Sequence, residues 1–517
     1  MTPESPRELL ADLHRPSAYP HATDGIEHLQ THISHVFLAG EFAYKLKKPV
    51  DFGFLDFTSP EKRRTACQEE LRLNRRLAPE IYLGVVPVCR GAGGHRIAPG
   101  GCAHGETETE VAVRMRRMPQ DGMLDRLADA GKLELAHMVD IARQLTVFHA
   151  HAARGPEVEQ YGHLACIRAP VMQNFEQTAP YIGLVVSAER CDHLHTAAEE
   201  FLKRHADWFE ARVRHRRIVD GHGDLHLRNM CLVHGRVVIF DCIEFNPQLR
   251  AGDVMSDIAF LTMDLDHRRL PAHGNRFLNE YLEQTRDYAG LLLLDFYQAY
   301  RACVRGKVLC FETGHRPQAA AEAAEYFALA ERYLAPRRGG LLITCGVSGS
   351  GKTTLARQVA APLGAVMVRS DAVRKHLAGI PLIQRGAESG RDIYSTDMTE
   401  RTYAALLEHA REVVASGRWA ILDAVYGRSG ERAAAAALAR ELGVPFGMLY
   451  CTALHEELRR RVARRTEDGV DISDATVAVL EAQLGRFEAP RPGEAEMFEW
   501  TGNEDPSHWL EGLKVGG

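Results

Sequence analysis

The sequence predicts a multidomain protein of mixed α/β and α+β class, with two folded parts of different architecture. In the first part, short alternating strands give way to a region that is mainly helical. In the second part, buried apolar strands are interleaved with helices, a pattern typical of a parallel sheet. The length of 517 residues exceeds what one hydrophobic core supports, and a prior of about three domains follows from length alone.

Composition and charge are ordinary for a globular protein. Hydrophobic residues make up 45% and charged residues 26%, and the net charge of −6 disfavours a nucleic-acid substrate. No apolar run approaches the roughly 18 residues of a membrane span, and the first residues lack the basic start of a signal peptide. The 11 cysteines show no C-x-x-C spacing. These features predict a cytoplasmic protein with reduced cysteines rather than a disulfide framework.

Breaker-rich segments divide the chain. The predicted parts are a lead-in at 1–30 with a helix at Pro6–Leu13, a strand-rich lobe at 31–118, a helical lobe at 119–335, a linker at 336–340 and a second α/β domain at 341–517. Within the helical lobe, apolar periodicity predicts helices at 133–152, 197–213, 276–288, 293–311 and 318–334.

The first strands carry two lysines on one face. Alternation begins at residues 35–38, turns at Gly40 and resumes at 42–47, so that Lys45 and Lys47 lie on the same side of the second strand. A lysine in this position is usually a solvated charge on an edge strand.

A helix and two further strands complete the first lobe. Residues 61–77 are typical of a helix and carry the adjacent acids Glu69 and Glu70. Alternation at 81–88 and 109–118 predicts the remaining strands.

The helical lobe contains a loop that opens with His-Gly-Asp and continues into a hairpin. Apolar runs at 230–233 and 237–240 flank a His-Gly turn, so the hairpin returns Asp241 towards Asp224 and Asn229. Protein-kinase chemistry uses such a set: an Asp that accepts the hydroxyl proton, an Asn five residues later for Mg²⁺, and a further Asp for Mg²⁺.

The motif H-G-D-x-H-x-x-N, followed by a strand that ends in Asp, resembles the aminoglycoside phosphotransferase and choline-kinase branch of the protein-kinase-like fold. The resemblance implies Asp224 as catalytic base and Asn229 and Asp241 as Mg²⁺ ligands. It further implies Lys45 as the ATP lysine, with Lys47 in reserve, and Glu70 as its partner, with Glu69 as the alternative.

Three further positions follow from this resemblance. Met115 and Met118 would line the adenine pocket, although core packing is the commoner role of a Met. The first hairpin has only Gly40 where protein kinases carry G-x-G-x-x-G, a departure that the aminoglycoside-kinase branch shares, and phosphate contacts are expected near Gly40. Asp253 and Asp257 would support the catalytic loop, the alternative being a simple helix N-cap.

The second part opens with a phosphate-binding motif. Residues 341–345 form an apolar strand, G-x-x-x-x-G-K-T follows, and residues 355–361 continue as a helix. Backbone N–H groups of such a loop bind phosphates, Lys352 neutralises the β- and γ-oxygens, and Thr353 holds Mg²⁺. The predicted nucleotide-binding residues are Gly346, Ser348, Gly349, Ser350, Gly351, Lys352, Thr353 and Thr354.

Carboxylates end two further strands of this part. Residues 365–368 lead to Asp371, a candidate acceptor base, and to Arg374, a candidate substrate contact; the alternative is an N-cap and an exposed Arg. A strand at 419–423 ends in Asp423, a candidate Mg²⁺ ligand.

An arginine-rich helix and two strands complete the second part. Strands are predicted at 446–451 and 497–500, and a helix at 454–466. Its arginines resemble the lid of small-molecule P-loop kinases, and the spacing leaves two equivalent pairs, Arg460 with Arg464 and Arg461 with Arg465.

Residues 340–517 resemble the gluconate-kinase, zeta-toxin and polynucleotide-kinase group of P-loop phosphotransferases. The whole chain resembles bacterial fusions of an aminoglycoside phosphotransferase-like domain with a predicted P-loop kinase. The resemblance implies two ATP–Mg²⁺ sites that phosphorylate hydroxyls of small molecules. Three alternatives remain: one active kinase with a nucleotide-sensing partner domain, a polynucleotide 5′-hydroxyl kinase, and a toxin-like kinase.

Overall fold

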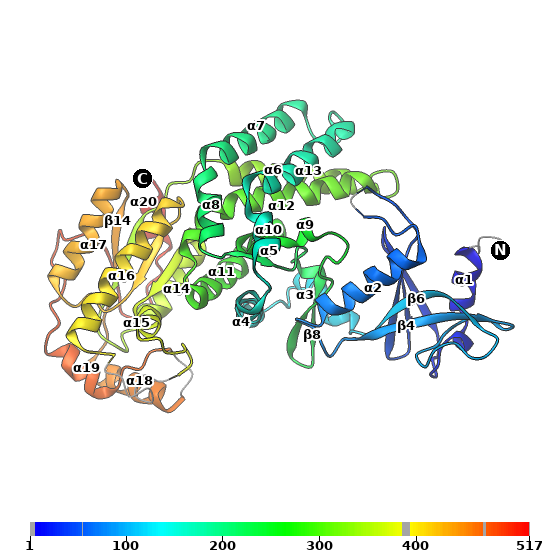
Figure 1. Cartoon of the computed structure of the whole chain (residues 1–517). Coiled ribbons are helices and arrows are strands. Elements are labelled where there is room, and N and C mark those ends of the chain that lie inside the picture. Colours follow the sequence, from blue (N-terminus) through cyan, green and yellow to red (C-terminus); the bar gives the residue numbers. More distant parts are fainter. Residues whose placement is uncertain (1–5, 54, 385–392, 469–471, 516–517) are drawn as a thin grey trace. The chain divides into compact units, whose positions relative to one another are not determined.

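The computed structural model describes residues 6–53, 55–384, 393–468 and 472–515 (Figure 1). The chain groups into two compact units. Unit 1 comprises Met1–Gln173 and His205–Asp264, and unit 2 comprises Asn174–Arg204 and Leu265–Gly517. The division therefore runs within the region predicted as the helical lobe, 119–335, and the helices that follow residue 265 belong to the same unit as the P-loop.

Unit 1 contains a six-stranded antiparallel sheet in the order β1-β2-β3-β6-β4-β5. The strands are β1 (Ile26–Gln30), β2 (Ser34–Ala39), β3 (Phe42–Lys47), β4 (Tyr82–Gly91), β5 (Gly94–Ile97) and β6 (Thr107–Arg116). Helix α1 (Pro6–Leu13) packs against β5, and α2 (Pro60–Asn74) packs against β4 and β6. Ser59 caps α2 by accepting a hydrogen bond from the Lys62 N–H.

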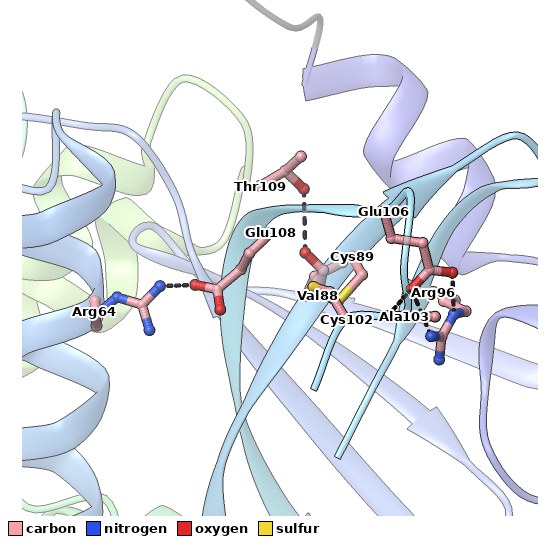
Figure 2. The surroundings of a disulfide bond; sticks show 9 residues. All are labelled: Arg64, Val88, Cys89, Arg96, Cys102, Ala103, Glu106, Glu108 and Thr109. Atoms are coloured by element: carbon pink, nitrogen blue, oxygen red, sulfur yellow. Dashed lines mark hydrogen bonds and ion pairs between the residues drawn. A yellow bond between two sulfur atoms is a disulfide. The ribbon is translucent and has the colours of Figure 1, made fainter. Parts of the chain in front are cut away.

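One disulfide corrects the expectation of reduced cysteines. Cys89 on β4 is bonded to Cys102, which lies in the segment between β5 and β6 (Figure 2). The β4–β5 hairpin brings the two together across a separation of 13 residues, a proximity that cysteine spacing alone does not reveal. The Arg96–Glu106 ion pair lies near the disulfide, and Glu106 also accepts from the Ala103 N–H (Figure 2).

The predicted loop and hairpin form in unit 1. Strands β8 (Met230–Val233) and β9 (Arg236–Ile239) pair antiparallel, with Met230 opposite Ile239. The turn residues His234 and Gly235 both have positive φ, at 50° and 77°, as a tight hairpin turn requires.

Unit 1 also contains a small sheet and several helices. Strands β7 (Ile218–Asp220) and β10 (Ala251–Asp253) form a two-stranded antiparallel sheet. The helices are α3 (Leu124–Asp129), α4 (Leu135–His151), α5 (Pro156–Glu159), α8 (Ala206–Arg214), α9 (Pro247–Arg250) and, running across the unit boundary, α6 (Leu164–Thr178) and α10 (Val254–His267).

Unit 2 is built on a five-stranded parallel sheet in the order β12-β13-β11-β14-β15. The strands are β11 (Leu341–Cys345), β12 (Val366–Arg369), β13 (Ala420–Asp423), β14 (Phe446–Cys451) and β15 (Glu496–Trp500). The helices of this part are α14 (Lys352–Leu363), α15 (Ser370–Ala378), α16 (Thr396–Ala415), α17 (Ser429–Leu442), α18 (His455–Asp468), α19 (Val477–Leu484) and α20 (Ser507–Val515). The β11–α14 connection carries the glycine loop, as the motif predicts.

Unit 2 also contains helices that precede the linker. They are α7 (Ala188–Arg204), α11 (Pro271–Thr285), α12 (Leu291–Glu312) and α13 (Ala319–Leu334). Helices α12 and α13 pack together, and α11 packs on β12 and α14. The single helix predicted at 197–213 is wrong: α7 ends at Arg204 and α8 begins at Ala206, because His205 leaves the helical region with φ −116° and ψ 26°.

Among the described residues, no helix has both the length and the apolar character needed to cross a membrane.

Candidate functional site

In unit 1 the structure brings Lys45 together with two carboxylates. Its Nζ lies 2.8 Å from Glu70 Oε1 and 2.6 Å from Asp241 Oδ1. Lys45 comes from β3, Glu70 from the buried face of α2, and Asp241 from the residue after Phe240, so three separate elements build this cluster. The Glu70 side chain is fully buried, whereas that of Asp241 is 39% exposed and open to a ligand.

Lys47, the reserve candidate, occupies a different position. Its buried Nζ lies 2.5 Å from Glu70 Oε2 and also pairs with Glu244, an acid that the sequence analysis missed. Glu70 thus bridges the two lysines of β3, while Glu69 pairs with Arg72 on the outer side of α2. The geometry separates Lys45, which faces Asp241, from Lys47, which is enclosed.

Burial and pairing shift the pKa values of Lys45, Glu70 and Glu244. Burial alone would lower the pKa of Lys45, but Asp241 and Glu70 raise it well above its usual value. Burial opposes ionisation of Glu70 as well, yet the two lysines lower its pKa to about 2. Burial raises the pKa of Glu244 in spite of Lys47. Lys45 and Glu70 are therefore ionised together near neutral pH.

The loop residues Asp224 and Asn229 are held in contact. Asn229 Nδ2 donates to Asp224 Oδ2 at 2.8 Å and to the Asp224 carbonyl at 2.9 Å. The Phe240 N–H donates to the Asn229 carbonyl at 3.0 Å, which places Asn229 across the hairpin from the residue before Asp241. Asp241 itself has a positive φ of 64°, and its N–H donates to the Tyr82 hydroxyl at 3.3 Å. The loop and the hairpin end therefore meet, as the sequence predicts.

Two acids of α10 hold the backbone of the loop that carries Asp224 and Asn229. Asp257 accepts hydrogen bonds from the N–H groups of His222 and Gly223, both at 2.9 Å, and Asp264 accepts from the Leu227 N–H at 3.0 Å. Burial opposes ionisation of Asp257, but the hydrogen bond from His149 leads the effects that lower its pKa to about 2. Gly223 has a φ of 84°, and a Cβ there would lie 2.8 Å from the Leu249 carbonyl oxygen.

The other candidates of unit 1 take structural positions. Asp253 holds Arg212 through two hydrogen bonds and caps α10 by accepting from the Met255 N–H. Met115 is buried in the sheet core, where Met118 also packs. The predicted contacts of Met115, Met118 and Gly40 with a nucleotide stay predictions.

In unit 2 the glycine loop has a geometry that demands glycine. Gly346, Gly349 and Gly351 have positive φ values of 139°, 84° and 96°. A Cβ would lie 2.3 Å from the Cys451 carbonyl oxygen at Gly346, and 2.3 Å from the Trp500 ring at Gly351. The loop therefore curls tightly, with its backbone against neighbouring elements.

The lysine and threonine that follow this loop lie beside Asp423. Thr353 Oγ1 donates to Asp423 Oδ2 at 2.7 Å, and Lys352 Nζ donates to the Val347 carbonyl at 2.9 Å. Burial lowers the pKa of Lys352, with Asp423 acting in the opposite direction. Thr353 and Asp423 are thus in contact, and the Mg²⁺-binding role that the sequence analysis gives them stays a prediction.

A cavity of about 670 Å³ adjoins the loop. Asp371 and Arg374 line it together with Lys352, Thr353 and Asp423. Arg374 Nη1 donates to the Ile393 carbonyl at 2.7 Å, and the guanidinium lies 5.0 Å from the centroid of the Tyr394 ring. Arg374 is thus fixed within the wall, with 7% of its surface exposed, rather than being an exposed helix charge.

The geometry of α18, the predicted lid helix, distinguishes its two arginine pairs. Arg461 and Arg465 line the cavity, and Arg461 Nη1 donates to the Gly349 carbonyl at 3.4 Å. Arg460 and Arg464 are not among the described residues that line the cavity. The Arg460 side chain is 76% exposed and pairs with Glu457.

Sequence reasoning missed several residues of this cavity. Arg369 lines it from the end of β12, and Gln483 of α19 accepts a hydrogen bond from the Ser348 N–H at 2.8 Å. Arg369 was visible two positions before Asp371 at a strand end, whereas no sequence signal pointed to Gln483. Across the described ranges, no group of three His, Cys, Asp or Glu is arranged to hold a metal; both predicted Mg²⁺ pairs combine Asp with Asn or Thr.

Comparison with known proteins assigns both parts of the chain. Residues 52–294 match the family described as "Phosphotransferase enzyme family", and residues 341–490 match the family described as "AAA domain". Uncharacterized proteins of Mycobacterium bovis and Mycobacterium tuberculosis are 34% identical over 462 residues, which cover 88% of this chain and 89% of each relative.

Solved structures show more distant similarities. A choline/ethanolamine kinase family protein from Mesorhizobium loti is 14% identical, with a TM-score of 0.39, and covers 63% of this chain and 95% of its own. The APS kinase of Mycobacterium tuberculosis is 19% identical, with a TM-score of 0.26. The similar region covers 35% of this chain and 98% of the APS kinase. A gluconokinase from Sinorhizobium meliloti is 22% identical, with a TM-score of 0.23. The similar region covers 34% of this chain and 88% of the gluconokinase.

The family matches and the mycobacterial relatives agree with the geometry of the two units. Both parts are of kinase type, which supports phosphotransferase activity in general. The chain belongs to the bacterial family that joins an aminoglycoside phosphotransferase-like domain of protein-kinase-like fold to a P-loop kinase domain.

Proposed function

We propose that this protein is a bifunctional ATP-dependent phosphotransferase, in which each unit transfers the γ-phosphoryl group of ATP to a hydroxyl of a small-molecule acceptor. One observation carries the proposal: each unit independently brings a lysine and a carboxylate of the Mg²⁺-binding type into one site. In unit 1 these are Lys45 and Asp241, and in unit 2 they are Lys352 and Asp423. Phosphoryl transfer depends chiefly on such charge neutralisation and on positioning.

The residues of the glycine loop fit a nucleotide phosphate. The Ser350 hydroxyl oxygen is buried without a hydrogen-bond partner among the described residues, in a loop where a Cβ at Gly346 or Gly351 would clash. An anion that accepts from this loop would satisfy the orphaned group. In unit 1 the fit rests on donor chemistry, because Asn229 and Asp241 offer the oxygen ligands that Mg²⁺ prefers.

Residue roles in unit 1 follow from position. Asp224 is the proton acceptor for the substrate hydroxyl, and Asn229 orients its carboxylate through Nδ2. Lys45 neutralises phosphate oxygens while Glu70 fixes its ammonium. Asn229 and Asp241 would hold Mg²⁺, which supplies Lewis-acid neutralisation of the phosphates when bound.

Residue roles in unit 2 follow in the same way. Lys352 neutralises phosphate oxygens, Thr353 and Asp423 would hold the ion, and Asp371 accepts the proton of the acceptor hydroxyl. Arg374 orients the acceptor from its fixed place in the cavity wall, and Arg461 and Arg465 serve as the lid cations.

Two single variants test the proposal on the full chain. Asp224→Asn and Lys352→Ala are purified, and each is incubated with ATP, Mg²⁺ and a metabolite extract that is screened for mass gains of one phosphate. We expect each variant to lose one set of phosphorylated products and to keep the other. If one variant loses all products and the other loses none, the protein is a single kinase with a nucleotide-sensing domain. If neither variant loses any product, the assigned sites are wrong.

A further inference from the structure

Helix α11 covers the edge strand of the P-loop sheet with polar side chains. Asn275, Asn279 and Glu283 recur every four residues and therefore share one face of the helix. Asn279 Oδ1 accepts from the Met367 N–H at 2.6 Å, and Asn279 Nδ2 donates to the Ala365 carbonyl at 3.1 Å. Asn275 Nδ2 also donates to the Ala365 carbonyl, at 2.9 Å. These amides satisfy the Met367 N–H on the outer side of edge strand β12 and the carbonyl of Ala365, the residue before that strand.

One turn further along α11, Glu283 reaches the end of the same strand. Both of its carboxylate oxygens lie 3.5 Å from Arg369 Nη1, and its own carbonyl accepts from His376 Nε2 at 2.8 Å. Glu283 and Arg369 are 8% and 6% exposed, so this pair is buried. Helix α11 thus extends its contacts from the backbone of β12 to a side chain of the cavity.

Arg369 connects this pair to the candidate Mg²⁺ residues. Arg369 Nε lies 3.7 Å from Asp423 Oδ2, the oxygen that also accepts from Thr353 Oγ1 at 2.7 Å. The result is a continuous polar route from Glu283 through Arg369 and Asp423 to Thr353. Glu283 is therefore outside the cavity lining but one residue removed from it.

Glu283 and Asp423 both attract the guanidinium of Arg369. Arg369 stands between two carboxylates, and the more strongly one attracts it, the less it neutralises the other. Burial raises the pKa of Glu283, and the nearby Arg369 guanidinium opposes that rise. Without the Glu283 charge, Arg369 would be attracted more strongly towards Asp423 and would compete with a divalent ion for its oxygens.

We infer that Glu283 is a positioning residue for the P-loop site, which holds Arg369 so that Asp423 stays available to Thr353 and to Mg²⁺. The inference rests on the proposed function of that site. It means that a helix from the segment matched to the phosphotransferase family completes the P-loop centre. Metal sites commonly depend on such outer partners, whose loss weakens metal affinity about 10- to 100-fold.

The test uses the full chain in a Lys45→Ala background, which weakens nucleotide binding in unit 1. ATP binding is measured by calorimetry over a series of Mg²⁺ concentrations, and ATP turnover is measured in parallel. We expect Glu283→Gln to raise the Mg²⁺ concentration for half-maximal ATP binding about tenfold or more, with turnover at saturating Mg²⁺ largely retained. An unchanged Mg²⁺ requirement, or the absence of ATP binding altogether, would overturn the inference.

Asp295→Asn is the matched control. Asp295 of α12 pairs with Arg418 at 2.5 Å, and so joins the helix that follows α11 to the same sheet, at the beginning of β13 rather than at the carboxyl end of β12. We expect this variant to lose stability without a change in Mg²⁺ requirement; an equal change in both variants would mean that Glu283 is merely structural. A double variant with Arg369→Gln should bind Mg²⁺ no more weakly than Arg369→Gln alone, because Glu283 acts through Arg369. Additive losses would contradict that route.

These measurements separate the inference from the proposed function. If ATP binding depends on Glu283 as expected but no turnover occurs in any variant, phosphotransfer in unit 2 is wrong and the positioning role stands. If turnover persists and the Mg²⁺ requirement does not respond to Glu283→Gln, the positioning role is wrong and the proposed function stands.

Discussion

Lys45 Nζ lies 2.6 Å from Asp241 Oδ1, although 196 positions separate the two residues in the sequence. Glu70 lies on the other side of the same ammonium group, at 2.8 Å. The cluster therefore ties the sheet, helix α2 and the end of the β8–β9 hairpin to one charge. Its stability depends on pairing, because each of these groups is costly to leave charged and unpaired in a buried place.

Lys47 is the first test of that dependence. Among the described residues, Lys47→Ala removes the lysine that pairs with Glu244 and one of the two lysines that pair with Glu70. Because both acids are buried, we expect unit 1 to lose about 3–5 kcal/mol of local stability. Hydrogen exchange of the β3 and α2 amides measures the loss.

The matched control for Lys47 is an exposed pair in the same unit. Lys62 pairs with Asp56, and both side chains are at least 41% exposed, so Lys62→Ala should cost much less stability than Lys47→Ala. Equal effects of Lys47→Ala and Lys62→Ala would show that the buried cluster does not depend on its second lysine.

Asp257 makes the stability of the loop that carries Asp224 and Asn229 depend on pH. Its pKa in the folded protein is about 2, against an ordinary value of 3.8. An acid with a depressed pKa stabilises the fold above its unfolded pKa, and this contribution is lost as the pH falls from 3.8 towards 2. The shift corresponds to about 2 kcal/mol at neutral pH.

Urea unfolding of the protein and of Asp257→Asn between pH 3 and 7 measures this contribution. We expect a constant gap in the free energy of unfolding from pH 7 to about 5, which narrows below about pH 4. A gap that stays constant down to pH 3 would contradict the role of the ionised carboxylate.

Gly351 should be indispensable for nucleotide binding in unit 2. Its φ is 96°, and a Cβ would lie 2.3 Å from the Trp500 ring, so Gly351→Ala must displace either the loop or that ring. We expect calorimetry in a Lys45→Ala background to show that ATP affinity falls at least about 100-fold, since the loop N–H groups lose their alignment.

Gly364→Ala is the control for backbone strain alone. Gly364 ends α14 with a φ of 60°, and no atom lies within 4 Å of the place where its Cβ would be. The substitution should cost about 1–2 kcal/mol of stability and leave ATP affinity unchanged. Loss of affinity in both variants would point to global destabilisation.

The lid assignment separates two adjacent arginines. Arg461 and Arg460 both pair with Glu457, but Arg461 lines the cavity and contacts the Gly349 carbonyl, whereas Arg460 is mostly exposed. In an Asp224→Asn background, Arg461→Ala should lower turnover in unit 2 about 10- to 1,000-fold, because a cation near the transferring group is removed. Arg460→Ala should stay within about twofold; the reverse order would assign the lid to the other helix face.

Local patterns predicted much of this protein. The hairpin at 230–240, the glycine loop and the alternation of β3 each depend on short-range preferences, and the structure forms all three. Helix bounds were less certain, as the break at His205 shows, because a continuous apolar period does not reveal where tertiary packing turns the chain.

Only the tertiary structure distinguishes adjacent residues of the same type. Sequence reasoning treats Glu69 and Glu70 alike, and likewise Arg460 and Arg461, because two adjacent residues of the same type have the same helix propensity. Packing of α2 against the sheet buries Glu70 and exposes Glu69 to Arg72, and packing of α18 against the loop turns Arg461 to the cavity. The disulfide between Cys89 and Cys102 depends in the same way on a hairpin.

The sequence alone determined the chemical types present: two lysines, the carboxylates at strand ends, and the glycines that phosphate binding requires. Tertiary structure alone decided which of them meet, and it added Glu244 to one cluster and the Glu283–Arg369 pair to the other. The physical reason is that the reach of a side chain is a few ångströms, whereas the residues that complete each site lie far apart along the chain. Contacts of that kind exist only after the hydrophobic layers have packed and placed their polar ends together.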